Sequence, residues 1–359
     1  MTEQKTALIT GFTGQDGSYL ALYLLKLGYQ VVGLTRRIST EPPPRFRLPE
    51  LLNYYQTGQL KLAVGEMADY FSITQVLRQY QPDEIYNLAA QSHVGISFQT
   101  PEETIRVNFI GALNVVRAAQ DLKLPTKIYQ ASTSEMFGNA ARETEPQNEN
   151  TPFRPISPYG IAKLAAHNIM AMARNTEQGF AIPTTCGILF NHESPIRGEN
   201  FVTRKITKAV ARMARGEQEI LELGSLSSER DWGFAGDYVK MMHLMLQQPG
   251  LPHEWQDFVV ATGVKHTVRE FVEAAFRAIG WQITWQGEGA NEQGLVNGQL
   301  RVRVSPEFYR PNEIWTLRGN PAKARQLLGW EPTTAFDDLV KMMVKADLES
   351  ISEESASVS

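Results

Sequence analysis

Cysteine is almost absent from this 359-residue sequence: Cys186 is the only one, which excludes an intramolecular disulfide. The sequence also lacks an uncharged apolar stretch of the roughly 18 residues that cross a membrane. Residues 1–5 lead directly into a strand-like run rather than into a signal peptide. The 35 Lys and Arg nearly balance the 39 Asp and Glu, which argues against binding to nucleic acid or an anionic membrane. We therefore expect a cytoplasmic protein in which Cys186 is a buried thiol.

Strand-like and helix-like segments alternate through the first half of the chain. Six short β-rich runs predict strands at residues 6–10, 31–35, 60–64, 84–89, 127–131 and 184–189. Amphipathic segments between them predict helices at 14–27, 72–80, 101–122 and 158–177. A later helix at 237–246 and a strand at 257–262 are expected to return to the same sheet. The pattern predicts an α/β fold with a Rossmann-type, doubly wound parallel sheet.

The regular alternation weakens after residue 192. We predict that residues 1–192, with about 233–262, form the Rossmann domain. A smaller C-terminal lobe that binds substrate would consist of residues 193–232 and 263–348. Four prolines within residues 41–49 exclude a continuous helix there. The Ser- and Glu-rich end, residues 349–359, is predicted to be disordered.

A glycine-rich loop follows the first predicted strand and opens the first helix. Its residues are Gly11, Phe12, Thr13, Gly14, Gln15, Asp16 and Gly17. Closely spaced glycines let backbone amides approach a pyrophosphate at the positive end of a helix. The alternative is a simple turn, but the position between a strand and a helix near the N-terminus favours a dinucleotide site.

The residues after the second strand choose between the two nicotinamide dinucleotides. An acidic residue there would bind the ribose diol of NAD, whereas arginine favours the 2′-phosphate of NADP. The chain has Arg36 and Arg37 at this point. Two solvated arginines are the alternative interpretation, but their position predicts NADP.

Tyr159 and Lys163 lie four residues apart at the start of a predicted helix, so they share one face. A nearby ammonium is expected to lower the tyrosine pKa and make it a general base. The strand before this helix ends in Ser132-Thr133-Ser134-Glu135, at the sheet edge where ligands bind in this architecture. The alternatives are an exposed Tyr–Lys pair and a simple helix cap made by the hydroxyls and Glu135.

These motifs, together with Asn-Leu-Ala-Ala-Gln-Ser-His-Val at 87–94, resemble the extended short-chain dehydrogenase/reductase family. Within it the chain is similar to the GDP-mannose 4,6-dehydratases over about residues 5–345. The most specific motifs are Gly-Ile-Leu-Phe-Asn-His-Glu-Ser-Pro at 187–195 and Arg-Gly-Glu-Asn-Phe-Val-Thr-Arg-Lys-Ile at 197–206. Arg-Asp-Trp-Gly at 230–233, Tyr-Arg-Pro-Asn-Glu at 309–313 and Leu-Gly-Trp at 328–330 follow in the same order.

The resemblance implies a reaction and a role for each catalytic residue. Members of the family oxidise carbon 4 of the sugar, eliminate water across carbons 5 and 6, and return the hydride to carbon 6. Tyr159, supported by Lys163, would take the 4-hydroxyl proton, and Thr133 would bind that oxygen. Glu135 would remove the carbon 5 proton. Ser134 stands where dTDP-glucose dehydratases have an acid, so Glu135 or a water molecule would protonate the departing 6-hydroxyl.

The resemblance also implies binding residues and partners. For NADP it points to the loop from Gly11 to Gly17, Arg36, Arg37, Glu66, Met67, Leu88, Ala89, Ala90, Gln91, Ser92, Tyr159, Lys163, His192 and Arg197. For the nucleotide sugar it points to Ser92, Asn191, Lys205, Arg230, Arg310 and Glu313. We predict no metal site. A homodimer or homotetramer is implied, with pairing through helices 101–122 and 158–177 and a 36–49 loop that extends to a neighbour.

Three positions depart from the family pattern. Glu66-Met67 replaces Asp-Leu, Ile196 replaces the first of two arginines, and Glu229 replaces a lysine. The exchange at Glu229, of a basic for an acidic residue beside the expected diphosphate, makes a heptose analogue of GDP-mannose one alternative substrate. An epimerase or a 4-keto reductase of the same fold would need no role for Glu135. A non-catalytic, cofactor-sensing protein is a third interpretation, against which the retention of all four catalytic residues argues.

Overall fold

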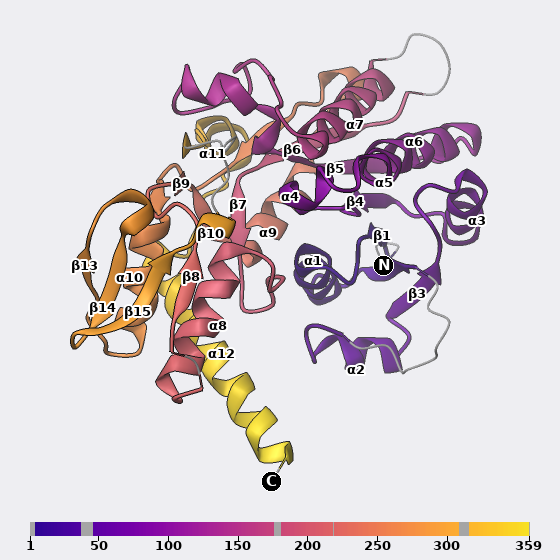
Figure 1. The fold of residues 1–359 in the computed structure, drawn as a ribbon. Helices are drawn as coiled ribbons and strands as arrows, with labels where there is room; N and C mark the ends of the chain where they lie inside the picture. The colour runs from indigo at the N-terminus through magenta and orange to yellow at the C-terminus, as the bar shows by residue number, and fades with distance from the viewer. Residues whose placement is uncertain (1–3, 37–45, 176–180, 218, 309–315, 359) are drawn as a thin grey trace.

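The computed structural model describes residues 4–36, 46–175, 181–217, 219–308 and 316–358. A seven-stranded sheet lies at its centre, in the order β11-β6-β5-β4-β1-β2-β3, and every neighbouring pair is parallel (Figure 1). The strands are β1 Thr6–Thr10, β2 Gln30–Thr35, β3 Leu60–Val64, β4 Glu84–Asn87, β5 Lys127–Thr133, β6 Thr184–Leu189 and β11 Phe258–Val260. This order confirms the predicted doubly wound sheet.

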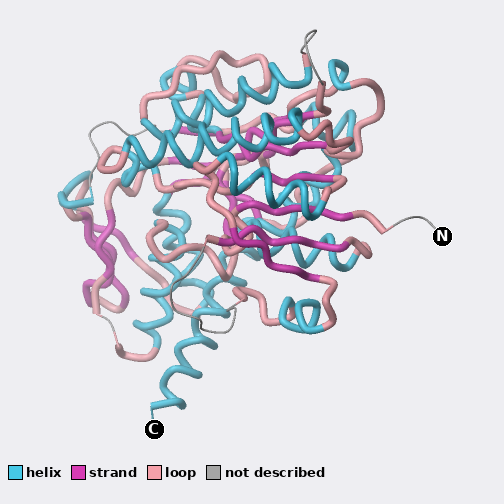
Figure 2. The backbone as a smooth tube through the Cα atoms, turned by 90° about the vertical axis from the view of Figure 1, so that its right-hand side faces the viewer, coloured by secondary structure: helices cyan, strands magenta, loops and turns pink. Residues whose placement is uncertain are grey.

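Both faces of the sheet are covered by helices (Figure 2). Ala7 and Ile9 of β1 pack into one buried cluster, and Leu8 packs into another on the opposite face, as the alternation of a strand requires. The first cluster includes side chains of α1 (Gln15–Lys26) and α9 (Ala235–Met245). The second includes side chains of α3 (Tyr70–Tyr80), α6 (Gly111–Asp121) and α7 (Pro158–Arg174).

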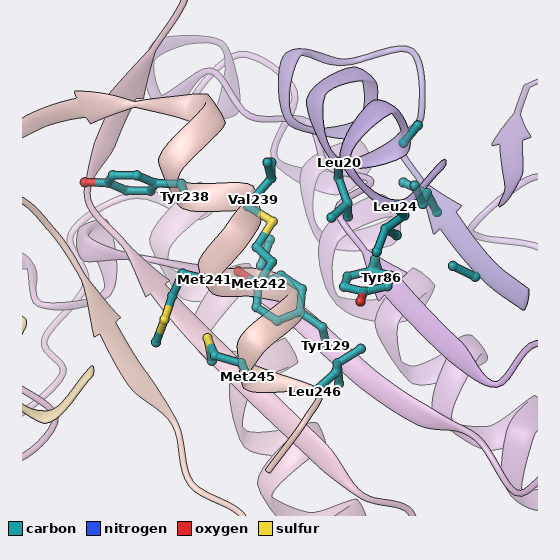
Figure 3. Packing of buried hydrophobic residues seen from close by; sticks show 14 of the residues in the cluster. Leu20, Leu24, Tyr86, Tyr129, Tyr238, Val239, Met241, Met242, Met245 and Leu246 are labelled. Carbon is teal, nitrogen blue, oxygen red and sulfur yellow. The ribbon is translucent and has the colours of Figure 1, made fainter. Parts of the chain in front are cut away.

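Three methionines of α9 pack into the first cluster (Figure 3). Met242 points toward α1, Met241 and Met245 point to the other side of α9, and all three are fully buried. They belong to the same cluster as the buried rings of Tyr86 on β4 and Tyr129 on β5. The unbranched methionine side chain adapts to such irregular gaps. This packing attaches a late segment of the chain to the first sheet.

The second lobe has its own core between α8 (Val202–Ala214), α10 (Val268–Ala278) and α12 (Phe336–Val358). A small sheet in the order β13-β14-β15-β8 covers it, with strands β8 Leu221–Leu223, β13 Thr284–Gln286, β14 Gln293–Val296 and β15 Gln299–Val304. Two smaller sheets adjoin it, formed by β7 Asn191–Glu193 with β10 Trp232–Phe234, and by β9 Glu229–Arg230 with β12 His266–Thr267 and β16 Thr316–Leu317.

Several elements differ from the prediction. The end of the chain, predicted to be disordered, continues α12 as far as Val358. Helix α11 (Ala322–Leu328) packs on β11, and Trp330 joins the first cluster, so part of the segment assigned to the lobe packs on the large sheet. Short helices α2 (Leu51–Gln56) and α4 (Val94–Ser97) were not predicted. No helix in the described ranges combines the length and apolar character that a membrane crossing requires.

The helix predicted at 101–122 is interrupted by a π-turn. It consists of α5 (Pro101–Ile105), the π-turn Arg106–Ile110 and α6. Asn108 in the π-turn accepts a hydrogen bond from the Gln91 N–H at 2.8 Å and donates one to the Gln91 carbonyl at 3.0 Å. The wider turn therefore anchors the segment that follows β4, and such turns are frequent next to functional sites.

Candidate active site

The glycine-rich loop forms one wall of a cavity of about 390 Å³ at the carboxyl ends of β1, β2 and β4. This is the edge at which the strand order reverses, where open α/β sheets bind ligands. Gly11 has a φ of +68°, and a Cβ there would lie 2.8 Å from the Ala89 N–H nitrogen, so a side chain would strain the loop and collide with the opposite wall. The loop thus has the backbone access that the glycine pattern predicts.

Most of the predicted cofactor residues line this cavity. They are Gly11, Thr13, Gly14, Gln15, Asp16, Gly17, Arg36, Glu66, Met67, Leu88, Ala89, Ala90, Gln91, Ser92 and Arg197. The side chain of Phe12 instead points into the core, where it is 3% exposed. Glu103 and Val107 also line the cavity and were not predicted. Arg37 lies outside the described residues.

Asp16 and His192, predicted as separate cofactor ligands, form a buried pair. His192 Nε2 lies 2.8 Å from Asp16 Oδ2, and its Nδ1–H donates to the Phe190 carbonyl at 2.7 Å. Burial opposes ionisation of Asp16, but the charge of His192 prevails and lowers the Asp16 pKa to about 2. Burial likewise opposes a charge on His192, but Asp16 raises its pKa above the ordinary value. The pair therefore joins the glycine-rich loop to β7, and the sequence contained no signal for it.

Two arginines fix the loops on the other side of the cavity, and one of them, Arg197, lines it. Arg197 forms an ion pair with Glu193 at 3.1 Å, and its guanidinium lies 3.6 Å from the centre of the Phe201 ring. Arg47 was not predicted to take part: it donates to the Thr13 carbonyl at 2.8 Å and to the Ile196 carbonyl at 3.0 Å. Arg47 thus connects the glycine-rich loop to the loop that carries Arg197.

A second cavity of about 150 Å³ contains the four predicted catalytic residues: Thr133, Glu135, Tyr159 and Lys163. It adjoins the first, because Asp16, Ser92 and Arg197 line both. Asn191 and His192 complete its wall.

Hydrogen bonds that cap two helical segments position the candidate catalytic residues. The Ser157 hydroxyl accepts from the Gly160 N–H at 3.0 Å and Pro158 occupies the first turn, so α7 starts one residue before Tyr159. Thr133 Oγ1 accepts from the Glu135 N–H at 3.2 Å and caps the short 3-10 turn Ser134–Met136. The alternative cap interpretation therefore holds for the Thr133 hydroxyl, and the cap itself presents the Glu135 side chain to the cavity.

The predicted lowering of the Tyr159 pKa by Lys163 is wrong for this structure. Burial raises the pKa of Tyr159 to about 12, although a hydrogen bond with Thr133 acts in the opposite direction. Lys163 Nζ lies 5.9 Å from the centre of the Tyr159 ring and donates to the Ala131 carbonyl at 2.8 Å. Burial also lowers the pKa of Lys163, to about 8. Loss of hydration is therefore the largest influence on the pKa of both groups.

The predicted substrate residues are only partly brought together. Ser92 and Asn191 line the catalytic cavity. Lys205 lies in a third cavity of about 300 Å³, with Nζ 3.4 Å from the centre of the Phe308 ring. Lys208, Arg212 and Glu222 also line this third cavity and were not predicted.

Arg230, on β9, lines none of these cavities; its guanidinium donates to the Glu229 carbonyl at 2.8 Å. The Glu229 carboxylate, which departs from the family pattern, is paired with Lys265 at 2.7 Å. Lys265 also pairs with Glu145 at 3.0 Å, so the two carboxylates share one ammonium. Arg310 and Glu313 lie outside the described residues.

Comparisons with known proteins agree with the sequence motifs. A family model described as GDP-mannose 4,6 dehydratase matches residues 8–343. The chain is 47% identical to the GDP-mannose 4,6 dehydratase of Drosophila melanogaster, over 97% of this chain and 87% of that protein. It is also 47% identical to the GDP-mannose 4,6-dehydratase of Sinorhizobium fredii (strain HH103), over 97% of this chain and 98% of that protein.

Solved structures with lower sequence identity share the fold. DesIV, a dTDP-glucose 4,6-dehydratase from Streptomyces venezuelae solved with NAD and TYD bound, has a TM-score of 0.78 at 19% identity, covering 97% of this chain and 98% of that chain. RMD from Pseudomonas aeruginosa, complexed with NADPH, has a TM-score of 0.74 at 19% identity, covering 97% of this chain and all of that one.

Proposed function

The chain belongs to the GDP-mannose 4,6-dehydratase family, and we propose that it converts GDP-mannose to GDP-4-keto-6-deoxymannose and water. The observation that carries this proposal is the position of Glu135 in the same cavity as Thr133, Tyr159 and Lys163. Oxidation alone needs the tyrosine, the lysine and the threonine. A carboxylate beside them supplies the additional base that an elimination requires.

The larger cavity suits a nicotinamide dinucleotide. The glycine-rich loop offers backbone N–H groups at the start of α1, and Arg36 lies exposed at the end of β2. When bound, the nicotinamide would accept a hydride from the sugar and later return it. The arginine at the end of β2 favours NADP over NAD, because its guanidinium can bind a 2′-phosphate.

The catalytic residues act on the sugar in sequence. Tyr159 must first lose its own proton, because its pKa is about 12 in this structure; the phenolate then takes the proton of the 4-hydroxyl, and Thr133 holds the same oxygen as it becomes a ketone. The ketone acidifies the proton on carbon 5, which Glu135 removes. The bond between carbon 6 and its hydroxyl then breaks, and the hydroxyl leaves as water with a proton from Glu135 or a water molecule. Carbon 6 receives the hydride and carbon 5 a proton, so the net change is the loss of one water.

Product analysis tests the proposal directly. The protein with NADP and GDP-mannose should form the 4-keto-6-deoxy sugar nucleotide, identified by NMR. A C4 epimer, or reduction of a supplied 4-keto sugar without dehydration, would instead indicate the alternative reactions of this fold. Faster conversion of a GDP-heptose than of GDP-mannose would change the substrate but retain the chemistry.

Arg36 should determine the choice of cofactor. We expect wild-type protein to bind NADP more tightly than NAD, and Arg36→Ser to weaken NADP binding by about 10–100-fold, the usual contribution of a hydrogen bond to a charged group. NAD binding should change little, because NAD has no 2′-phosphate. Isothermal titration calorimetry with both cofactors measures this. Equal or tighter binding of NAD by the wild type would contradict the prediction.

An exposed apolar surface supports the proposed homo-oligomer. Ile96 on α4, Ile105 on α5, Ile161 and Met172 on α7, and the adjacent Phe98 are between 36% and 58% exposed. Helices α4 and α5 both pack against α7, so these side chains belong to one region of the surface. Pairing of this region between two copies would bury it.

Ile161→Asp should therefore shift the protein toward monomers in light scattering. Phe71→Asp on α3 is the matched control, since Phe71 is 67% exposed outside this region. A wild-type protein with the mass of one chain at working concentration would refute the oligomer.

We also propose a cytoplasmic location, in line with Cys186 being a buried free thiol. Cell fractionation would test this location.

A further inference from the structure

A row of buried polar side chains starts at Ser132, in the wall of the catalytic cavity, and takes no part in the steps above. Ser132 Oγ lies 3.1 Å from Nδ1 of His167, and Nε2 of His167 lies 3.7 Å from Asp257 Oδ2. Arg174 donates to both carboxylate oxygens of Asp257 at 2.6 Å. Ser132 is 3% exposed and His167 is 7% exposed. Polar groups this deeply buried are stabilised only where they bond to one another.

This row touches the same two elements that carry the catalytic residues. His167 follows Lys163 by four residues, and Lys163 follows Tyr159 by four, so all three share one face of α7. Ser132 follows Ala131 on β5, and the Ala131 carbonyl accepts the hydrogen bond from Lys163 at 2.8 Å. Two successive residues of β5 are thus bonded to two successive turns of α7.

The surroundings of His167 favour one protonation state. Burial lowers its pKa, and the charge of Asp257 only partly compensates, so the ring is neutral at neutral pH. Asp257 lies on the Nε2 side and favours a proton there. Nδ1 is then an acceptor for the Ser132 hydroxyl. An edge-to-face contact between the rings of His167 and Phe153, whose centroids lie 5.3 Å apart, further restricts the orientation of the His167 ring.

A metal site is a poorer explanation of the cluster. His167, Cys186 and Asp257 have potential ligand atoms within 4.8 Å of one another. However, burial raises the pKa of the Cys186 thiol, whereas a metal requires the thiolate. Arg174 already occupies both oxygens of Asp257. The neutral ring and the paired carboxylate instead suit a fixed hydrogen-bonded contact between α7 and β5.

We propose that His167 is a positioning residue for the catalytic Tyr159–Lys163 pair. By bonding to Ser132 it sets α7 against the end of β5, where Thr133 and Glu135 face the cavity from the other element. Misplacement of a catalytic group by 1 Å can cost about 10²-fold in rate, so a fixed contact at this point affects the chemical step. The inference rests on the proposed dehydratase function for its kinetic consequences, whereas the hydrogen bond itself can be measured without catalysis.

Four variants test the kinetic role. His167→Phe keeps a ring but loses the acceptor, Ser132→Ala removes the donor, and His167→Gln retains a hydrogen-bonding group. We expect His167→Phe and Ser132→Ala each to lower kcat about 10-fold, with KM for GDP-mannose changed less than about 2-fold. His167→Gln should retain most of the wild-type kcat. His243→Phe is the control, because His243 is also partly buried and bonded, to Tyr29 at 3.2 Å, on α9 rather than α7.

The double variant and a spectroscopic measurement make the test decisive. If one bond is responsible, the His167→Phe/Ser132→Ala double variant loses no more kcat than either single variant. Losses of kcat that multiply in the double variant, an unchanged kcat in the single variants, or an effect confined to KM would overturn the proposal.

¹⁵N NMR of labelled histidine should show that Nε2 of His167 carries the proton and that Nδ1 does not. Ser132→Ala should change the chemical shift of Nδ1. A proton on Nδ1 would also overturn the proposal. A wild type that forms no 4-keto product refutes the proposed function, whereas the NMR result still decides the hydrogen bond.

Discussion

Glu135→Gln should slow product formation by about 10²–10⁴-fold, the usual contribution of a general base. Glutamine keeps the size of the side chain and its capacity for hydrogen bonds, but it cannot take the carbon 5 proton. The backbone N–H of residue 135 still donates to Thr133, so the cap that shapes this turn is retained. Oxidation at carbon 4 should therefore still be possible, and the reaction should stop before elimination.

Hydrogen exchange at carbon 5 gives a direct measurement of this step. In deuterated water the wild type should incorporate deuterium at carbon 5 of the product, since the position is deprotonated and then protonated by an exchangeable proton. Glu135→Gln should lose most of this incorporation, as measured by NMR or mass spectrometry. If the variant kept wild-type rates of product formation and exchange, Glu135 would only be part of a helix cap. The proposed function would then lose its main support.

Tyr159→Phe should act one step earlier and stop the reaction before oxidation. The substitution removes the hydroxyl that takes the proton from the 4-hydroxyl and leaves the buried ring in place; Tyr159 is 8% exposed. We expect kcat to fall by about 10²–10⁴-fold, and no transient absorbance of a reduced nicotinamide at about 340 nm. Carbon 5 exchange should disappear as well, because it requires the ketone.

Comparison of the two variants separates the half-reactions. Glu135→Gln should still allow a reduced nicotinamide to form in single-turnover absorbance measurements, whereas Tyr159→Phe should not. Binding of GDP-mannose and NADP to both variants, measured by calorimetry, should remain within about 3-fold of wild type if only chemistry is affected. A Tyr159→Phe variant that still formed reduced cofactor would assign the first proton transfer to a different group.

The central sheet and the candidate catalytic residues could be predicted from the sequence because local patterns encode both. Alternation of strand and helix determines a parallel sheet, and the order of the motifs along β1, β4 and β5 places their ends at one edge. Tyr159 and Lys163 share a helix face by spacing alone, which any α-helix enforces. The curated relatives confirm the family that these motifs indicated.

The smaller lobe and the electrostatics of the site could not be read in the same way. Strands β8 and β9 have three and two residues, too short for a periodic pattern, and they find partners from distant parts of the chain. The end of the chain has a polar composition typical of disorder, yet it continues a helix whose earlier turns pack into the core of the lobe.

The sequence by itself determined the α/β class, the glycine-rich cavity wall and the candidate catalytic side chains. Only the tertiary structure decided their electrostatic environment. It pairs Asp16 with His192, which are 176 residues apart, and it directs Lys163 to the Ala131 carbonyl. It also raises the pKa of Tyr159, which the sequence had predicted to fall. Spacing along one helix fixes which side chains share a face, but pKa values depend on burial and on charges brought from distant segments, and these exist only once the chain has folded.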